Sequence, residues 1–221
     1  MTLRQLISKF LPNAQGPIVM RLIGHRAYVG DMFEEIGQHV FNFLIQNGLK
    51  SGDILLDVGC GSLRVGKYTI PYLEAGHYLG LDKSKYLISK GLKTELSEKV
   101  VAEKHPEFVV SSNFEFHKFS QTPTIAIAHA LFTQLSPEMI QMCLTNLAHF
   151  VKSQIPFFVH FNEVERSVEN LRTSHDRIAF KYTIEELESI ANNSGWRIEE
   201  HIKDWKHPRG GSMIKLLNIR Q

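Results

Sequence analysis

An acid and two glycines stand together directly after an apolar run near residue 57. Residues 54–56 are Ile-Leu-Leu, Asp57 follows, and Gly59 and Gly61 come next at alternate positions. Such a run predicts a buried strand, and glycines at its end predict a tight turn whose backbone can approach a ligand closely. A second apolar run, residues 78–81, ends in a second acid, Asp82. Strand, glycine turn, helix, strand and acid is the layout of a nucleotide-like cofactor pocket.

The charge of Asp57 narrows the class of cofactor. A carboxylate at the mouth of the loop repels a pyrophosphate, whereas it attracts a ligand that carries an ammonium group. Asp82 falls at the carboxyl end of its predicted strand, where an acid can accept hydrogen bonds from ribose hydroxyls. We therefore expect a cofactor that has a ribose and a cationic amino group.

The elements that position these residues alternate between strands and helices. The last two predicted strands follow each other with no helix between them. We expect an α/β fold of the Rossmann-like, doubly wound type: a mainly parallel seven-stranded sheet with an antiparallel last strand and helices on both faces. The predicted strands are 53–58, 77–82, 108–110, 124–131, 155–161, 196–202 and 212–219, and predicted helices include 64–75, 84–104 and those that begin after Ser136 and after Thr183.

The first fifty residues predict a helical extension. We expect residues 1–50 to form an N-terminal cap on a core domain of residues 51–221. Apolar residues at helical spacing between Leu3 and Leu11 predict a first helix that docks on its own domain or on a partner; a membrane-surface helix is the alternative. Asp31, with Glu34 three residues later, predicts a capping box at the start of a longer helix.

Composition narrows the classes of function. The chain of 221 residues has 25 Lys and Arg against 23 Asp and Glu, and the basic residues are scattered, so no nucleic-acid partner is indicated. The two cysteines, Cys60 and Cys143, match neither a disulfide framework nor a zinc motif, so we expect no metal and a cytoplasmic location. No run of about 18 apolar residues exists, so no transmembrane segment is expected. The oligomeric state stays open.

The residues Asp57-Val58-Gly59-Cys60-Gly61-Ser62, followed by Leu63-Arg64, resemble the glycine motif of class I S-adenosylmethionine-dependent methyltransferases. The similarity returns at the strand ending in Asp82, at 130–137 (Ala-Leu-Phe-Thr-Gln-Leu-Ser-Pro) and at 204–210 (Asp-Trp-Lys-His-Pro-Arg-Gly), and spans about residues 25–219. These pieces resemble a bacterial subgroup with Phe-Thr-His-Leu after the fourth strand, where this chain has Gln134 in place of the histidine. The resemblance implies S-adenosylmethionine as cofactor and methyl transfer as the reaction.

The resemblance also implies where the cofactor lies. Asp57 would hold its ammonium group and Asp82 its ribose. Asn113 and Phe114 fall where the family contacts adenine, although this chain lacks the acid that the family usually has before the apolar residue. Because helices before the first strand often cover the cofactor in this architecture, we expect residues such as Tyr28 and Phe33 to form part of a lid. The remaining predicted cofactor contacts are Gly59, Cys60, Gly61, Lys83 and His129.

Three histidines are the candidate catalytic residues. His129 ends the fourth predicted strand, His160 ends the fifth, and His207 lies in the loop between the last two. Doubly wound folds place their ligands at the carboxyl ends of strands, and the pKa of histidine suits a general base. The candidate substrate-binding residues are Arg64, Glu163 and Arg209.

The sequence leaves the acceptor and two other functions open. We expect a small molecule or a glycan precursor as acceptor, with oxygen, nitrogen or carbon as the accepting atom. One alternative is an NAD-dependent oxidoreductase, against which stand the acid at position 57 and the spacing of Gly59, Gly61 and Gly66, which does not fit GxGxxG. The other is a catalytically inactive binding module with the methyltransferase fold, which the altered adenine segment favours.

Overall fold

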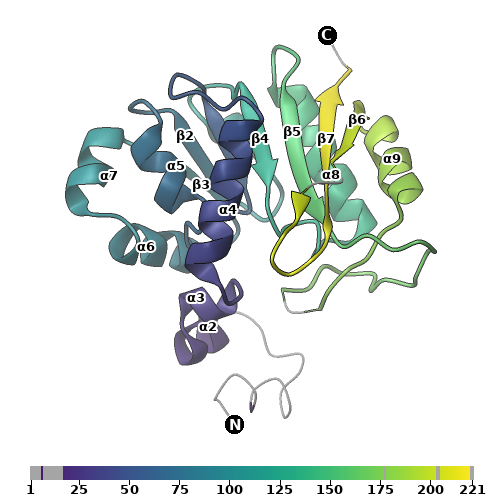
Figure 1. Ribbon diagram of the computed structural model, residues 1–221, viewed down its shortest axis with the longest axis horizontal. Coiled ribbons are helices and arrows are strands. Elements are labelled where there is room, and N and C mark those ends of the chain that lie inside the picture. Colours follow the sequence, from purple (N-terminus) through teal and green to yellow (C-terminus); the bar gives the residue numbers. More distant parts are fainter. Residues whose placement is uncertain (1–5, 7–16, 177, 203–204, 220–221) are drawn as a thin grey trace.

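The computed structural model describes residues 6, 17–176, 178–202 and 205–219 (Figure 1). The first predicted helix lies outside the described residues except for Leu6, and so does Asp204 in the last segment that resembles the methyltransferases. Among the described residues, no helix is both long enough and apolar enough to cross a membrane.

Seven strands of the described chain form one sheet: β1 Leu55–Val58, β2 Tyr78–Asp82, β3 Glu107–Val110, β4 Ile125–Ala128, β5 Pro156–Phe161, β6 Trp196–Ile202 and β7 Ser212–Asn218. Their order is β3-β2-β1-β4-β5-β7-β6. The pairs from β3 through β5 are all parallel, whereas β7 runs antiparallel to both β5 and β6. This confirms the predicted fold, a mainly parallel sheet whose last strand is antiparallel.

Strand residues alternate between two hydrophobic clusters, one on each face of the sheet. In β1, Leu56 and Val58 belong to the first cluster and Leu55 to the second. All four residues of β1 are buried, and so are all four of β4. Burial on both faces explains why these strands read as continuous apolar runs. By the same alternation, Asp57 lies on the face of Leu55.

Helices cover the two faces in separate groups (Figure 1). Apolar residues of α8 and α9 join the first cluster, and those of α4, α5 and α6 join the second. α4 therefore shares a core with the sheet, and a domain boundary near residue 50 stays a prediction. The helices are α2 Pro17–Ile23, α3 His25–Tyr28, α4 Phe33–Gln46, α5 Gly66–Tyr72, α6 Lys85–Thr94, α7 Glu98–Lys104, α8 Pro137–Phe150 and α9 Ile184–Asn193, with a 3-10 turn at Phe116–Lys118.

Two predicted helix starts have different outcomes. At α9 the Thr183 side chain accepts from the Glu186 backbone N–H, and the Glu186 carboxylate accepts from that of Thr183, so a full capping box forms. The capping box predicted at Asp31 is wrong. α4 begins at Phe33 after a left-handed Met32 (φ 59°), which makes no side-chain capping bond. The Glu34 carboxylate instead accepts from Lys67 and Tyr68.

Two predicted helices are shorter than expected. The helix predicted at 64–75 is α5, which begins only at Gly66, so turns rather than a helix follow the glycine motif. Pro71 lies within the last turn of α5. The helix predicted at 84–104 is divided into α6 and α7, because Ser97 caps a new helix by accepting from the Val100 backbone N–H.

Candidate active site

The glycine turn lies at the carboxyl end of β1, beside the end of β2. The backbone N–H groups of Gly59 and Cys60 both donate to the Leu81 carbonyl, at 2.7 and 3.0 Å. Gly59 and Gly61 adopt positive φ angles of 77° and 53°, which side chains other than glycine rarely adopt. The turn therefore follows a path that the glycines permit, with its backbone exposed to the adjoining cavity.

Two carboxyl groups flank this turn. Asp57 is 2% exposed, and its Oδ2 accepts from the Tyr78 hydroxyl at 2.7 Å. Burial raises the pKa of Asp57 to about 7, with the Tyr78 bond opposing the shift and Asp82 adding to it. Asp82 accepts from the backbone N–H groups of Gly61 and Ser84 at 2.9 and 2.7 Å. Burial also raises the pKa of Asp82, so both groups lie where a cationic or hydrogen-bond-donating ligand would favour their charged form.

A cavity of about 260 Å³, the cofactor cavity, opens beside the turn. Its walls include all the glycine-turn residues predicted to contact cofactor, together with both acids, Lys83, His129 and Phe114. Asn113 does not line it: the neighbouring Ser111 and Ser112 do, while the Asn113 carbonyl accepts from the Asn146 side chain at 2.9 Å. Ser111 and Ser112 are therefore the polar residues that line the cavity next to Phe114.

Three segments meet at the rim of the cofactor cavity. Tyr28, at the end of α3, donates its hydroxyl to Asp176 at 2.6 Å. The Lys83 ammonium group donates to the other oxygen of the same carboxylate. Met20 of α2 also lines the cavity and accepts from the Ser84 hydroxyl at 3.7 Å. Of the two residues predicted for a lid, Tyr28 lines the cavity, whereas Phe33 lines neither this cavity nor the adjoining one and packs against the Arg26 guanidinium, 4.7 Å from its ring centroid. The lid stays a prediction.

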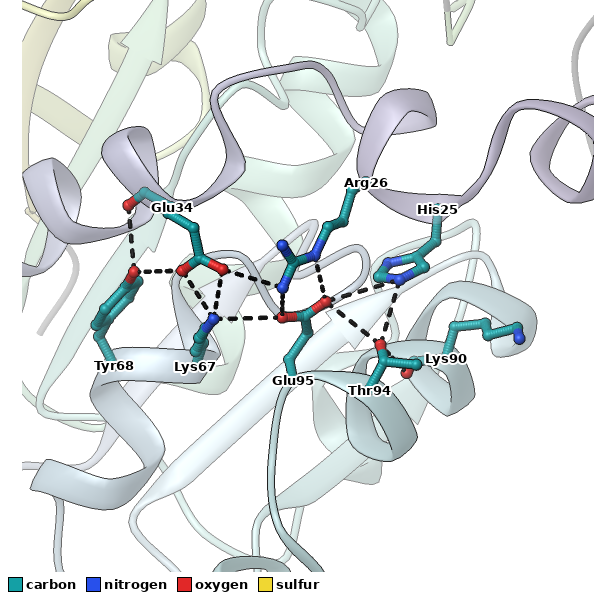
Figure 2. Close-up of polar contacts among 8 residues, drawn as sticks. All are labelled: His25, Arg26, Glu34, Lys67, Tyr68, Lys90, Thr94 and Glu95. Carbon is teal, nitrogen blue, oxygen red and sulfur yellow. Dashed lines mark hydrogen bonds and ion pairs between the residues drawn. The ribbon is translucent and has the colours of Figure 1, made fainter.

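A network of charged side chains connects α3 to α4, α5 and the end of α6 (Figure 2). Arg26 donates to both carboxylate oxygens of Glu95 at 2.8 and 2.5 Å, and the Glu95 side chain is fully buried. Arg26 also pairs with Glu34 at 3.0 Å. Lys67 joins both acids, at 2.5 Å to Glu34 and 3.6 Å to Glu95. We call these four residues the clamp, because they tie the segment that bears Tyr28 to α4, α5 and the end of α6.

A second cavity, of about 320 Å³, lies next to the first. The two cavities share seven lining residues: Tyr28, Val29, Arg64, His129, Ala130, Gln134 and Asp176. All three candidate catalytic histidines line the second cavity, whereas only His129 lines both. We call the second one the histidine cavity.

The three histidine side chains form one cluster. The Nε2 atoms of His129 and His207 lie 3.1 Å apart. The ring of His160 stacks on that of His129 with centroids 5.2 Å apart, and its centroid is 4.5 Å from that of His207. Burial lowers the pKa of His160 to about 4 and that of His207 to about 3, and it lowers the pKa of His129 well below its usual value. All three rings are neutral at pH 7.

Two arginines border the same space. The Arg64 guanidinium donates to the carbonyls of Val29 and Gly30 at 2.5 and 2.6 Å, which ties the segment after α3 to the glycine turn. Burial, with Arg209 nearby, lowers the pKa of Arg64 to about 10, so it remains charged at pH 7. A Cβ on Gly30 would lie 2.4 Å from the Arg209 guanidinium and 3.2 Å from that of Arg64. Two cations on either side of a glycine make a favourable place for an anion.

Glu163 is separate from both cavities. It accepts from the Ser212 hydroxyl and pairs with His201 at 3.0 Å, at the edge of β5, β6 and β7. The lining residues that sequence reasoning missed include Ser111, Ser112 and Asp176. The serines were within the predicted adenine segment, but Asp176 lies in an irregular stretch with no motif, so no sequence signal pointed to it.

No protein-family model matches the sequence, and no curated protein matches it. Solved methyltransferases do have similar structures. The magnesium protoporphyrin IX methyltransferase of Synechocystis, with S-adenosylmethionine bound, has a TM-score of 0.60 at 12% identity over 98% of this chain and 92% of that chain. An S-adenosylmethionine-dependent methyltransferase of Methanosarcina mazei gives 0.61 at 16% identity over 80% and 98%. A TehB-like methyltransferase of Corynebacterium glutamicum gives 0.58 at 17% over 92% and 96%. The chain has the fold of S-adenosylmethionine-dependent methyltransferases.

Proposed function

We propose that this protein is an S-adenosylmethionine-dependent methyltransferase whose acceptor is a small molecule or a glycan precursor. The observation that carries the proposal is the buried Asp57 carboxyl, which lines a cavity beside a glycine turn and opposite Asp82. A buried acid whose pKa is raised to about 7 is poorly solvated in its charged form. An ammonium ligand would offset this loss of solvation. The fold shared with solved methyltransferases supports the same reading.

The residues that line the cofactor cavity fit the parts of S-adenosylmethionine. Asp57 would hold the ammonium group and Asp82 the ribose hydroxyls, while Phe114, Ser111 and Ser112 would border adenine. Phe114 is buried and offers an apolar surface for a flat ring. When bound, the cofactor supplies a sulfonium methyl group for in-line displacement, so the protein must mainly position the acceptor and exclude water.

The histidine cavity would hold the acceptor. It borders the cofactor cavity along a shared wall, and His129 belongs to both. Arg64 and Arg209 would attract an anionic group of the acceptor, such as a carboxylate or a phosphate. The role of the histidines as general bases stays a prediction. Both cysteines are free and buried, which fits the proposed cytoplasmic location.

Calorimetric titration tests the function directly. We expect the purified chain to bind S-adenosylmethionine and its demethylated product, and we expect Asp57→Ala to weaken binding of the sulfonium form at least tenfold, or about 1.4 kcal/mol. Asp53→Ala is the matched control, since Asp53 accepts hydrogen bonds from Lys50 and Thr124 and does not line the cavity. Its affinity should equal that of the wild type.

Three results would contradict the proposal. Binding of NAD with no binding of S-adenosylmethionine would favour an oxidoreductase. Failure to bind either cofactor form would leave a non-catalytic module, and equal losses in Asp57→Ala and Asp53→Ala would place the ligand somewhere other than the cofactor cavity.

A further inference from the structure

We propose that His129, His160 and His207 bind one divalent transition-metal ion of the zinc type, with an open coordination position facing the histidine cavity. No motif in the sequence pointed to it, because the three residues lie far apart in the chain and lack the short spacing of common zinc motifs. The sheet topology brings them together, since β4 and β5 are neighbours and the β6–β7 loop folds over their carboxyl ends.

The geometry of the cluster suits three imidazole ligands. One ring nitrogen from each histidine lies within 4.8 Å of the other two, and one pair is already at 3.1 Å. Zinc–nitrogen bonds of about 2.0 to 2.1 Å in a tetrahedral site require the nitrogens to be roughly 3.3 Å apart. Small rotations of the imidazole rings, with no change of the strands, would bring the wider pairs to that spacing.

His160 is held with a free lone pair. Its Nε2 lies 3.2 Å from the Gly210 carbonyl, so that nitrogen carries the proton and donates. The lone pair is then on Nδ1, which is buried and has no hydrogen-bond partner among the described residues. A histidine that donates one ring N–H to a backbone carbonyl and presents the other nitrogen is the usual arrangement of a metal ligand. The adjacent Gly211 packs against this ring, where a Cβ would lie 2.4 Å from Nε2.

His129 and His207 share a single proton between their Nε2 atoms. The Arg209 backbone N–H donates to Nδ1 of His207 at 3.2 Å, so the Nε2–H of His207 donates to Nε2 of His129. A metal ion between the two rings would take the place of that proton, which would move to the other nitrogen of the same neutral ring without being released. His207 would then carry its proton on Nδ1, which gives up the long contact from Arg209. The exchange costs two hydrogen bonds, the one between the two Nε2 atoms and the one from the Arg209 backbone, and gains two metal bonds.

The donor set selects the type of metal. The cluster has three neutral nitrogens and no carboxylate. Imidazole ligands suit zinc, copper, iron and nickel, whereas magnesium and calcium prefer oxygen. Three protein ligands leave one position of a tetrahedral ion open, as in catalytic rather than structural zinc sites. Since all three histidines line the histidine cavity, that position faces the space proposed for the acceptor.

The role of the ion rests on the proposed function, whereas its binding does not. An acceptor oxygen or nitrogen bound at the open position would be held beside His129, in the wall shared with the cofactor cavity. In that arrangement the histidines are ligands, and the ion orients the accepting atom.

Metal titration of the chelator-treated protein tests the site. We expect one equivalent of Zn²⁺ to bind in calorimetry, and one equivalent of Co²⁺ to give the visible absorption of a tetrahedral or five-coordinate ion. His129→Ala, His160→Ala and His207→Ala should each weaken binding at least tenfold. His117→Ala is the matched control, because His117 is exposed on the 3-10 turn and far from the cluster in the fold. It should bind like the wild type.

Circular dichroism and thermal melting of each variant show whether it folds. If a variant does not fold, His207→Gln takes its place, because position 207 lies in a loop. The proposal is wrong if wild-type protein binds no stoichiometric Zn²⁺ and gives no Co²⁺ absorption, or if the His117 variant loses as much affinity as the cluster variants. Titration of S-adenosylmethionine on the same samples separates the two proposals. Metal without cofactor binding would contradict the proposed methyltransferase alone, and cofactor without metal binding would contradict the metal site alone.

Discussion

The cofactor cavity is bordered by the buried Asp57 and the half-buried Asp82, whereas the histidine cavity is bordered by three neutral imidazoles and by Arg209. They share a wall that includes Arg64 and Asp176, yet their separate ends favour ligands of opposite charge: a cation near Asp57 and an anion near Arg209. This difference in charge would direct two ligands to different cavities at one edge of the sheet. A cationic cofactor and an anionic acceptor would each be disfavoured in the other's place.

The cavities also differ in what builds their walls. Backbone turns form much of the cofactor cavity, with α6 packed so closely that a Cβ on Gly91 would lie 2.6 Å from the backbone of Ser62. The histidine cluster is instead formed by side chains that stack on each other and on Trp205, whose ring is 5.5 Å from that of His207. A change in helix packing should therefore affect the first cavity more than the second.

Gly91→Ala has the largest expected effect. In the interior of α6, alanine is normally favoured over glycine by up to about 1 kcal/mol. Here the added Cβ meets the Ser62 backbone, which cannot move as a flexible side chain can, so we expect a loss of about 1 to 3 kcal/mol in the free energy of unfolding. Urea denaturation measures it, and calorimetry should find weaker S-adenosylmethionine binding with unchanged Zn²⁺ binding.

Gly52→Ala is the control for this prediction. The nearest atom to its Cβ would be a Glu74 carboxylate oxygen at 3.6 Å, an ordinary contact, so stability should stay within about 0.5 kcal/mol of the wild type. A Gly91→Ala variant more stable than the wild type would mean that helix propensity outweighs the close contact. Loss of Zn²⁺ binding in it would mean that the two cavities are not independent.

The same contrast explains what the sequence predicted. The elements of the sheet and the position of Asp57 beside the cavity follow from local patterns: apolar runs, a glycine pair and an acid at fixed spacing around residue 57. The histidine cluster depends on strand order, which puts β5 beside β4, and on a loop that returns from β6. Each histidine was found singly at a strand end or in a loop, but nothing local indicated that their rings touch.

The failures of sequence reasoning are local and physical. The Asp31 capping box failed because Glu34, the residue that completes the pattern, is engaged by Lys67 and Tyr68 of α5. Asn113 fits the adenine position in sequence, yet the serines before it face the cavity. Tertiary contacts that no short pattern encodes decided both cases.

The affinity for S-adenosylmethionine should depend on pH through Asp57. Its pKa in the ligand-free protein is raised to about 7 by burial, and only the charged form attracts an ammonium group. Affinity should therefore rise about eightfold from pH 6 to pH 7.5, measured by calorimetry. The α-amino group of the ligand, whose pKa is about 7.7 to 8.0, is partly deprotonated at the upper end of this range, so the eightfold rise is an upper bound.

Stability responds to the same group with the opposite sign. The folded pKa lies above the unfolded value of 3.8, so the contribution of Asp57 to the free energy of unfolding is present below pH 3.8 and is lost as pH rises through 7. Asp57→Asn is the control: its weaker affinity should no longer depend on pH in this way, and its ligand-free melting temperature at pH 7.5 should exceed that of the wild type. An unchanged pH profile in Asp57→Asn would assign the titration to another group.

Arg26→Ala tests the cover of the cofactor cavity. Removing Arg26 leaves the buried Glu95 carboxylate with Lys67 at 3.6 Å as its charged partner, because burial lowers the pKa of the neighbouring His25. Because the Arg26 side chain is 46% exposed, we expect a loss near the lower end of the usual range for charged hydrogen bonds, about 1.5 kcal/mol. S-adenosylmethionine binding should weaken by a similar amount if Tyr28 covers the ligand.

Arg197→Ala, which removes an exposed pair with Glu199, should change neither quantity. Loss of stability without loss of affinity would mean that the clamp stabilises the fold only. Binding of S-adenosylmethionine would then not depend on the segment that bears Tyr28.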